Sequence, residues 1–368
     1  MSKVGETTLV LDLSALEHNY KYLRSKIEPT TKFLGVVKAF AYGSDMVTIA
    51  QKLEQLGADY LAVAYASEGV LLRQAGIKLP ILVLHPLASN FDDLIAYCLE
   101  PSLYSKNILK QFLKAAEIQE QKQYPVHIKF NTGLNRLGFS QVDVDFIAEE
   151  VKRNASVKIV STFSHLAASE DSNEREFSLA QIHSFSTSSK ALAEKLGYTP
   201  MRHMLNTSGI INYPEAQFEM VRSGIGLYGY GNQAEVDAAL KPVATLKTVI
   251  SQIHEIEPNH SVGYNRAFKA DQKTRSATLP LGHADGIGRQ YGKGKGSVTI
   301  NGKKAPILGN VCMDMIMVDV TGIDCKEGDE VIVFGPEKSA EAFAAGANTI
   351  SYEILTAISQ RVKRVVKN

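Results

Sequence analysis

A lysine that could attack a carbonyl group follows a short apolar run near the start of the chain. Lys38 comes directly after Phe33–Val37. An ammonium group in such a place is costly to bury unless it is paired or derivatised. In a dry pocket the pKa of a lysine falls, which favours nucleophilic attack and Schiff-base formation. Lys38 is therefore a candidate nucleophile toward an aldehyde.

Two later segments offer groups that bind phosphate. Thr207-Ser208 supplies hydroxyls, and Gly224-Ile225-Gly226 supplies accessible backbone N–H groups. Taken singly, Lys38 could be a solvated residue at a strand end, and each segment could be an ordinary turn. A Schiff-base lysine together with a phosphate site is what pyridoxal 5'-phosphate (PLP) requires. Their joint presence favours a PLP enzyme.

Alternating strands and helices must position these groups. Apolar runs of strand length alternate with stretches of helical periodicity, such as Met46–Leu56 and Phe177–Leu196. The eight runs predicted as strands are Phe33–Val37, Tyr60–Val63, Ile81–Leu84, Pro101–Tyr104, Val126–Phe130, Ile159–Phe163, Met201–Leu205 and Glu219–Arg222. Eight such units favour an α/β fold of the TIM-like (β/α)₈ barrel type over a doubly wound sheet. Reactive residues of such a barrel lie at the C-terminal ends of its strands. Ser14–Lys26 also reads as a helix, with Ser14 as its N-cap and Glu17 completing a capping box.

The pattern changes after about Gly231, where strands follow one another without long helices. The expected strands are Pro242–Ile256, Arg275–Leu281, Ser297–Leu308 with a hairpin turn at Asn301-Gly302, Met315–Val320 and Glu330–Phe334. Ser351 could cap a final helix at Tyr352–Val362. We therefore expect a PLP-binding barrel at 1–235 and a smaller, mainly β domain at 236–368. The run Thr8–Asp12 precedes the barrel, so residues 1–12 are free to pair with the second domain.

Composition narrows the function classes. Forty lysines and arginines balance 39 aspartates and glutamates, so no strong field favours nucleic acid or an anionic membrane. No apolar run approaches the roughly 20 residues that span a bilayer, and the first residues lack the apolar core of a signal peptide. The three cysteines form neither a disulfide framework nor a metal site. We expect a cytoplasmic protein without a bound metal.

Several blocks resemble the alanine racemases. Val36–Gly43 reads VVKAFAYG and is similar to the PLP-attachment pattern V-K-A-x-A-Y-G of that family. Further similar blocks follow in the family's order, at Lys129–Gly133, Arg136–Gly138, Ser164–Ala167, His203–Thr207, Arg222–Gly229, Val262–Arg266, Ala284–Arg289, Gly309–Asp314 and Ile350–Glu353. The blocks cover nearly the whole chain.

The resemblance implies roles for barrel residues. Lys38 would carry PLP covalently, and Arg222 would face the pyridine nitrogen. The residues implied to bind the phosphate are Tyr42, Thr207, Gly224, Ile225 and Tyr352, and those implied to support the ring are His203 and Asn206. Arg136 would lie near the substrate carboxylate, beside Lys129, which in this family can be carbamylated.

The resemblance also implies a head-to-tail homodimer with shared active sites. The partner's second domain would provide Tyr264 as a second catalytic base and the backbone N–H of Met313 as a contact for the substrate carboxylate. Arg289 and His165 would lie beside Tyr264 and favour its phenolate form. Asp314 would be a further polar residue near the site.

Racemisation requires one group on each face of the substrate α-carbon. Lys38 would serve the D-isomer and Tyr264 the L-isomer, and D-alanine supply for peptidoglycan is implied by the resemblance. Alternatives remain open: a broader racemase that accepts serine, a basic amino-acid decarboxylase, or a PLP-binding homeostasis protein without turnover. A decarboxylase would place an acidic residue where Arg222 stands, and a homeostasis protein would resemble only the barrel.

Overall fold

A closed barrel of parallel strands forms the first part of the computed structural model, which describes residues 6–368. Its strands are β2 (Lys32–Val36), β3 (Tyr60–Val63), β4 (Ile81–Val83), β5 (Glu100–Leu103), β6 (Tyr124–Lys129), β7 (Val157–Phe163), β8 (Met201–His203) and β9 (Met220–Ser223). β9 pairs with β2 and closes the ring. The predicted (β/α)₈ barrel is therefore confirmed, and most residues of its strands are buried because helices cover their outer faces.

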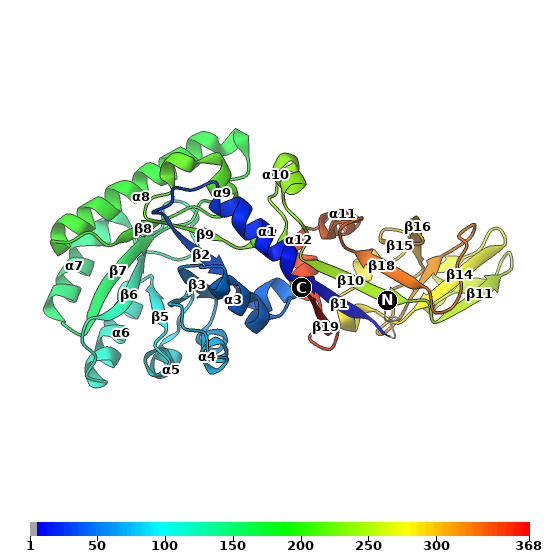
Figure 1. The fold of residues 1–368 in the computed structure, drawn as a ribbon, viewed down its shortest axis with the longest axis horizontal. Coiled ribbons are helices and arrows are strands. Elements are labelled where there is room, and N and C mark those ends of the chain that lie inside the picture. The colour runs from blue at the N-terminus through cyan, green and yellow to red at the C-terminus, as the bar shows by residue number, and fades with distance from the viewer. Residues whose placement is uncertain (1–5) are drawn as a thin grey trace.

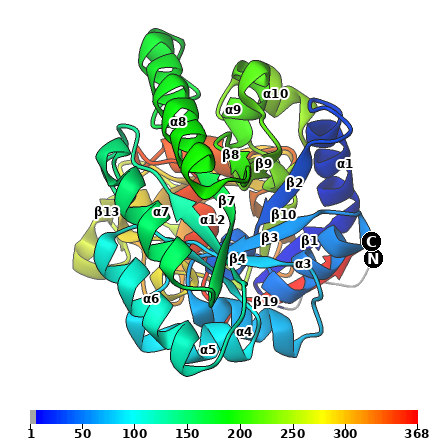
Figure 2. The same cartoon turned by 90° about the vertical axis from the view of Figure 1, so that its left-hand side faces the viewer.

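Helices surround the barrel, as Figure 2 shows in a view toward its end. They are α1 (Leu13–Arg24), α2 (Lys38–Gly43), α3 (Met46–Gln55), α4 (Ala66–Gln74), α5 (Phe91–Ala96), α6 (Lys106–Ile118), α7 (Val144–Arg153), α8 (Arg175–Leu196), α9 (Thr207–Asn212) and α10 (Ala234–Ala239). The predicted N-cap of α1 is wrong: Asp12, not Ser14, accepts the hydrogen bond from the Ala15 N–H. Glu17 pairs with lysines instead of closing a capping box. Within residues 6–368, no helix combines the length and apolar character needed to cross a bilayer.

A separate nine-stranded sheet lies at the other end of the molecule (Figure 1). It contains β1 (Thr8–Asp12), β10 (Ala244–Val249), β11 (Gln252–Ile256), β14 (Thr274–Leu279), β15 (Ser297–Ile300), β16 (Lys303–Leu308), β17 (Ile316–Asp319), β18 (Glu330–Phe334) and β19 (Lys363–Lys367). Short strands β12 (Ser261–Val262) and β13 (Phe268–Lys269) and helices α11 (Ala340–Ala345) and α12 (Ser351–Ala357) complete this part. Asn301 and Gly302 have positive φ and turn the predicted hairpin between β15 and β16.

Three expectations for this part are corrected. Ile350, not Ser351, is the N-cap residue of the final helix, and the Ser351 hydroxyl has no hydrogen-bond partner among residues 6–368. The run Pro242–Ile256 is divided into two strands, because the chain leaves the ladder at Ile250 and Ser251 and enters a different pairing at Gln252. The final helix ends at Ala357, and the chain then returns as β19, which was not predicted because Lys363–Lys367 has only a short apolar pair. The N-terminal strand β1 pairs with β10 and β19, while residues 1–5 of the expected N-terminal segment lie outside the described residues.

The backbone after Lys38 makes a left-handed turn. Ala39–Tyr42 all have φ between 53° and 55°, a conformation that costs roughly 1–2 kcal/mol per L-residue. Gly43 follows with φ 77°, and a Cβ atom there would lie 1.9 Å from the Leu355 carbonyl oxygen of α12. Glycine is therefore required for the close contact between the turn and the second part of the chain.

One arginine fastens this turn to the C-terminal segment. The Arg364 guanidinium donates to the Gly43 carbonyl at 2.7 Å and to the Ser44 carbonyl at 3.1 Å. It also donates to three carbonyls of its own segment, those of Ile358, Ser359 and Val362. Since these bonds join α2 to the chain that follows α12, Arg364 holds a strained turn against the second domain.

Replacing Arg364 should therefore destabilise the protein well beyond an ordinary surface change. We expect Arg364→Ala to lower the free energy of unfolding by ~3 kcal/mol or more, because several partly buried carbonyls lose a charged donor. Urea unfolding measures this. The control is Arg153→Ala in α7, whose ion pair with Glu149 is exposed and should contribute less than ~1 kcal/mol. Equal losses in the two variants would contradict this role.

Candidate active site

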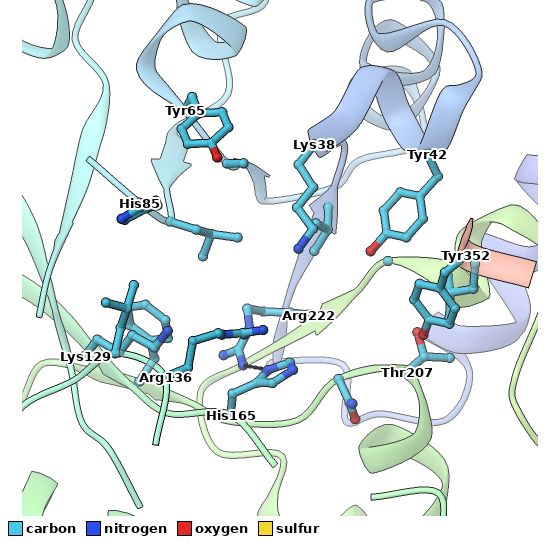
Figure 3. A pocket seen from close by; sticks show the side chains of 18 of the residues that line it. Lys38, Tyr42, Tyr65, His85, Lys129, Arg136, His165, Thr207, Arg222 and Tyr352 are labelled. Atoms are coloured by element: carbon cyan, nitrogen blue, oxygen red, sulfur yellow. Dashed lines mark hydrogen bonds between the residues drawn. The ribbon is translucent and has the colours of Figure 1, made fainter. Parts of the chain in front are cut away.

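The C-terminal ends of the barrel strands surround a cavity of about 690 Å³. Its polar lining residues are Lys38, Tyr42, Tyr65, His85, Lys129, Arg136, His165, Asn206, Thr207, Ser208, Arg222 and Tyr352, with Gly224 and Ile225 contributing backbone. Tyr352 comes from α12, and the other residues follow or end barrel strands. In Figure 3, Lys38 extends into the cavity, with Tyr42 and Tyr352 on one side and Lys129, Arg136 and His165 on the other.

Lys38 begins α2, directly after the first barrel strand. Burial lowers the pKa of its amine, and the positive charge of Arg136 lowers it further, while Glu68 opposes the shift. Glu68 also accepts from the backbone N–H groups of Ala39 at 2.6 Å and Ala64 at 2.7 Å. The carboxylate thus ties the turn that carries Lys38 to the end of β3, while burial disfavours the charged form of the lysine.

Lys129 and Arg136 add positive charge to the cavity. Lys129 is only 6% exposed, and burial together with Arg136, Arg222 and Lys38 lowers the pKa of its amine to about 8. No aspartate or glutamate lines this cavity among the residues that the structure describes. A pocket with several cations and no acid is suited to an anionic ligand.

Arg222 lies buried on β9 at the base of the cavity. Its guanidinium donates to the carbonyls of Ser164 at 2.7 Å, Met204 at 2.9 Å and His203 at 3.0 Å, and to His203 Nδ1 at 2.7 Å. Figure 3 shows its further contact with His165 Nδ1, at 3.3 Å. Burial lowers the pKa of Arg222 to about 9. The side chain therefore keeps its charge at neutral pH in a fixed orientation.

The two histidines that touch Arg222 are held in the neutral form. Burial lowers the pKa of His165 and of His203 well below the usual value, and the neighbouring Arg222 charge acts in the same direction. His165 lines the cavity. His203 is fully buried beneath Arg222, and its side chain does not reach the cavity. His203 therefore stands one layer behind the cavity wall.

Tyrosines and a glycine form one end of the cavity. Burial raises the pKa of Tyr42 and of Tyr352, so both phenols stay protonated and can donate hydrogen bonds. Tyr42 stacks on Tyr228 with ring centroids 4.5 Å apart. A Cβ atom on Gly224 would lie 2.1 Å from the Tyr42 hydroxyl oxygen. The backbone can approach that hydroxyl only because residue 224 is glycine.

These features fit PLP. A lysine amine with a lowered pKa matches its aldehyde, and the phenols, the Thr207 hydroxyl and the glycine backbone match a phosphate. The absence of lining carboxylates over the described residues avoids repulsion with the phosphate. The donor set therefore agrees with the cofactor that the sequence predicts.

The expected residues of the second domain do not reach this cavity within one chain. Tyr264 and Met313 line a separate hollow of about 560 Å³, together with Asp314 and Met315. Tyr264 is 72% exposed and Met313 is 60% exposed. Asp314 pairs with Arg361 at 2.6 Å. Arg289 is exposed and lines neither cavity.

Two polar lining residues were missed in the sequence. Tyr65 follows β3 and His85 follows β4, and the two rings lie 6.0 Å apart. The rule that reactive groups follow barrel strands could have found both, because each comes within two residues of a strand end. Neither position falls in a block that resembles the family.

Comparisons with known proteins agree with this architecture. The family model described as "Alanine racemase, N-terminal domain" matches residues 11–232, and "Alanine racemase, C-terminal domain" matches residues 243–366. Alanine racemase from Clostridium novyi (strain NT) is 38% identical over 372 residues, which cover 97% of this chain and 95% of that protein. Alanine racemase 1 from Clostridium acetobutylicum is 36% identical, with 97% and 95% covered.

Solved structures of alanine racemases have the same fold at somewhat lower sequence identity. Alanine racemase from Clostridium difficile 630 superposes with a TM-score of 0.93 at 34% identity, covering 98% of this chain and 96% of that one. Alanine racemase from Bartonella henselae with covalently bound pyridoxal phosphate has a TM-score of 0.89 at 29% identity, covering 99% and 100%. The two family models together cover both parts of the chain, and each of these relatives covers both parts by itself. The chain therefore belongs to the alanine racemase family of isomerases.

Proposed function

We propose that this protein interconverts L-alanine and D-alanine with PLP, using Lys38 and Tyr264 of the partner subunit as two opposed bases. The observation that carries the proposal is the cavity itself. It contains a lysine with a lowered pKa above a buried arginine, and no carboxylate lines it among the described residues. Membership of the family supports the same reaction.

Lys38 would hold the cofactor through its amine, and the phosphate would lie at the Tyr42 end of the cavity. There, Tyr42, Tyr352 and Thr207 can donate from hydroxyls, while Gly224 permits close approach of the backbone. When bound, PLP withdraws electrons from the α-carbon of an attached amino acid, so that its α-proton becomes removable. Lys38 can then take up or return a proton at Nζ on one face.

Inversion of the α-carbon requires a second proton-transfer group on the opposite face. Tyr264, the candidate for this group, lies beside the separate hollow and does not line the cavity of its own chain. Tyr264, Met313 and Met315 are all exposed around that hollow, and such a cluster of large side chains is typical of an interaction surface. We infer that a second copy places Tyr264 and the Met313 N–H at the cavity mouth, in a homodimer with shared sites.

Arg136 would bind the substrate carboxylate, because it lines the cavity and carries a planar pair of donors. Lys129 lies in the same cation cluster. Its lowered pKa supplies the neutral amine that carbamylation requires, and the resulting anion would offset the Arg136 charge. Arg289, Asp314 and His165 would support Tyr264 of the partner subunit from either side of the interface.

Arg222 favours racemisation over the alternative reactions. A carboxylate at the pyridine nitrogen would strengthen the electron sink, as a decarboxylase requires, whereas a fixed guanidinium disfavours ring protonation. Tyr264 and Tyr352 would narrow the mouth of the site, which favours alanine over serine or larger substrates. We propose that the enzyme acts in the cytoplasm and supplies D-alanine for peptidoglycan, as a member of a family found in bacteria.

Deuterium incorporation tests the reaction. The PLP-loaded protein, incubated with L-alanine in deuterated water, should form D-alanine that carries α-deuterium, because the removed proton is replaced from solvent. Lys38→Arg should abolish both products, since its guanidinium keeps a charge but neither attacks the aldehyde nor acts as a base at neutral pH. Arg153→Ala is the matched control. Release of carbon dioxide, or D-alanine without deuterium, would contradict the proposal.

Because the pKa of Lys129 is lowered in the folded protein, the free energy of unfolding should increase as the pH rises from about 8 to 10.5. Between about pH 8 and the ordinary value of 10.5, the unfolded chain binds a proton that the folded chain has lost, so folding becomes more favourable as pH rises. Lys129→Met should therefore be more stable than wild type by ~3 kcal/mol below pH 8, and this advantage should shrink toward pH 10.

Urea unfolding of the cofactor-free protein, without bicarbonate, measures this difference at each pH. The control is Lys158→Met, which changes an exposed lysine on β7 and should give a difference that does not vary with pH in this way. A Lys129→Met advantage that stays constant from pH 7 to pH 10 would show that the folded-state amine is not perturbed.

A further inference from the structure

A chain of hydrogen bonds crosses the interior of the barrel from Arg222 to Glu100. Arg222 Nη1 lies 2.7 Å from His203 Nδ1, and His203 Nε2 lies 2.9 Å from Ser161 Oγ. The same Ser161 oxygen lies 2.5 Å from His127 Nδ1, and His127 Nε2 lies 2.7 Å from Glu100 Oε2. Each residue comes from a different strand, in the order β9, β8, β7, β6 and β5.

Arg222 determines which atom donates and which atom accepts in each hydrogen bond of the chain. A guanidinium only donates, so His203 must accept at Nδ1 and carry its proton at Nε2. That N–H donates to Ser161, which leaves the serine hydroxyl to donate to His127 Nδ1. His127 then carries its proton at Nε2 and donates to Glu100. With one proton on each imidazole, this assignment satisfies every atom of the chain.

The glutamate end requires the same direction. A carboxylate only accepts, so it matches the His127 Nε2–H that the arginine end demands. Glu100 is 9% exposed, and its carboxylate has no lysine or arginine within ion-pair distance among residues 6–368. Burial and the nearby Glu100 carboxylate raise the pKa of Tyr60, so this phenol stays protonated next to the acid. The hydrogen-bond chain is thus the main polar partner of a buried acid.

Packing restricts the rings of the chain to these positions. His203 stacks on Phe163 with centroids 4.9 Å apart and planes 9° apart. The His127 ring meets the His203 ring edge to face at 6.2 Å. Neither histidine is exposed, so water cannot replace a lost partner. A change at Glu100 must therefore be accommodated along the chain rather than at its end.

We propose that Glu100 is a positioning residue for the reaction: through His127, Ser161 and His203 it orients the Arg222 guanidinium beneath the cavity. This inference rests on the proposed function, in which Arg222 faces the pyridine nitrogen and limits its protonation. A misoriented guanidinium would permit more protonation at the cofactor carbon. The side reaction is transamination, in which alanine and PLP become pyruvate and pyridoxamine phosphate in equal amounts.

The barrel offers a matched pair of serines for the test. Ser161→Ala removes the central link, whereas Ser102→Ala removes a buried hydroxyl that has no hydrogen-bond partner in the described part of the chain. Ser102 lies on β5 opposite His127 in the strand register, so both changes fall in the same part of the interior. Glu100→Gln is the third variant, because it keeps an acceptor oxygen but removes the charge.

Two readouts distinguish positioning from a structural contribution. The first is the ¹⁵N resonances of the histidine rings in the PLP-loaded protein, where His127 and His203 should both be Nε2–H tautomers. Ser161→Ala should shift the His203 signal, and Glu100→Gln should shift it less. The second is pyruvate formed per D-alanine, which should rise up to about tenfold in Ser161→Ala, the effect of losing one buried hydrogen bond between neutral groups. Ser102→Ala should change neither.

The proposal would be overturned if His203 carried its proton at Nδ1 in the wild-type protein. It would also be overturned if Ser161→Ala and Glu100→Gln left the pyruvate fraction unchanged, or if Ser102→Ala raised it equally. The ring signals can be read whether or not the protein racemises alanine. A failure of the hydrogen-bond chain is therefore distinct from a failure of the proposed reaction.

Discussion

The buried charge of Arg222 constrains the rest of the barrel. An isolated charge in a protein interior is strongly destabilising, so a buried guanidinium requires acceptors on every side. Here they are carbonyls at the ends of β7 and β8, together with the neutral rings of His203 and His165. The barrel must close with these strand ends in register, because any shift would leave a charged donor without a partner. The same contacts give the base of the cavity a fixed positive charge.

The cavity also contains Lys38, Lys129 and Arg136, and an anionic ligand would offset their positive charge. Lys38 and Lys129 lose part of their proton affinity to burial and mutual repulsion, which leaves amines that are more reactive than surface lysines. The left-handed turn at Ala39–Tyr42 brings Lys38 and Tyr42 to the same cavity, and Arg364 and Gly43 hold that turn against α12, which carries Tyr352. Strain next to the reactive lysine is thus balanced by contacts between the two parts of the chain.

Much of this arrangement could be predicted from sequence because it depends on local pattern. Apolar runs predicted all eight barrel strands, and the strand-end rule predicted Lys38 and Arg222 at one rim. The pairing of β19 with β1 and the hydrogen bonds of Arg364 to Gly43 and Ser44 could not be predicted, since their partners lie more than 300 residues away. The link from Arg222 to Glu100 could not be predicted because its members come from five different strands, and His127 and Ser161 look like ordinary strand residues until the barrel closes.

In the proposed homodimer, each active site combines Lys38 of one subunit with Tyr264 of the other. Mixing two inactive variants, Lys38→Ala and Tyr264→Phe, tests it most directly. If subunits exchange freely in an equal mixture, half of the dimers pair one chain of each kind, and each such dimer has one intact site of two. We therefore expect the mixture to recover about a quarter of the wild-type racemase activity. A mixture that exchanges subunits and stays inactive would contradict the shared site.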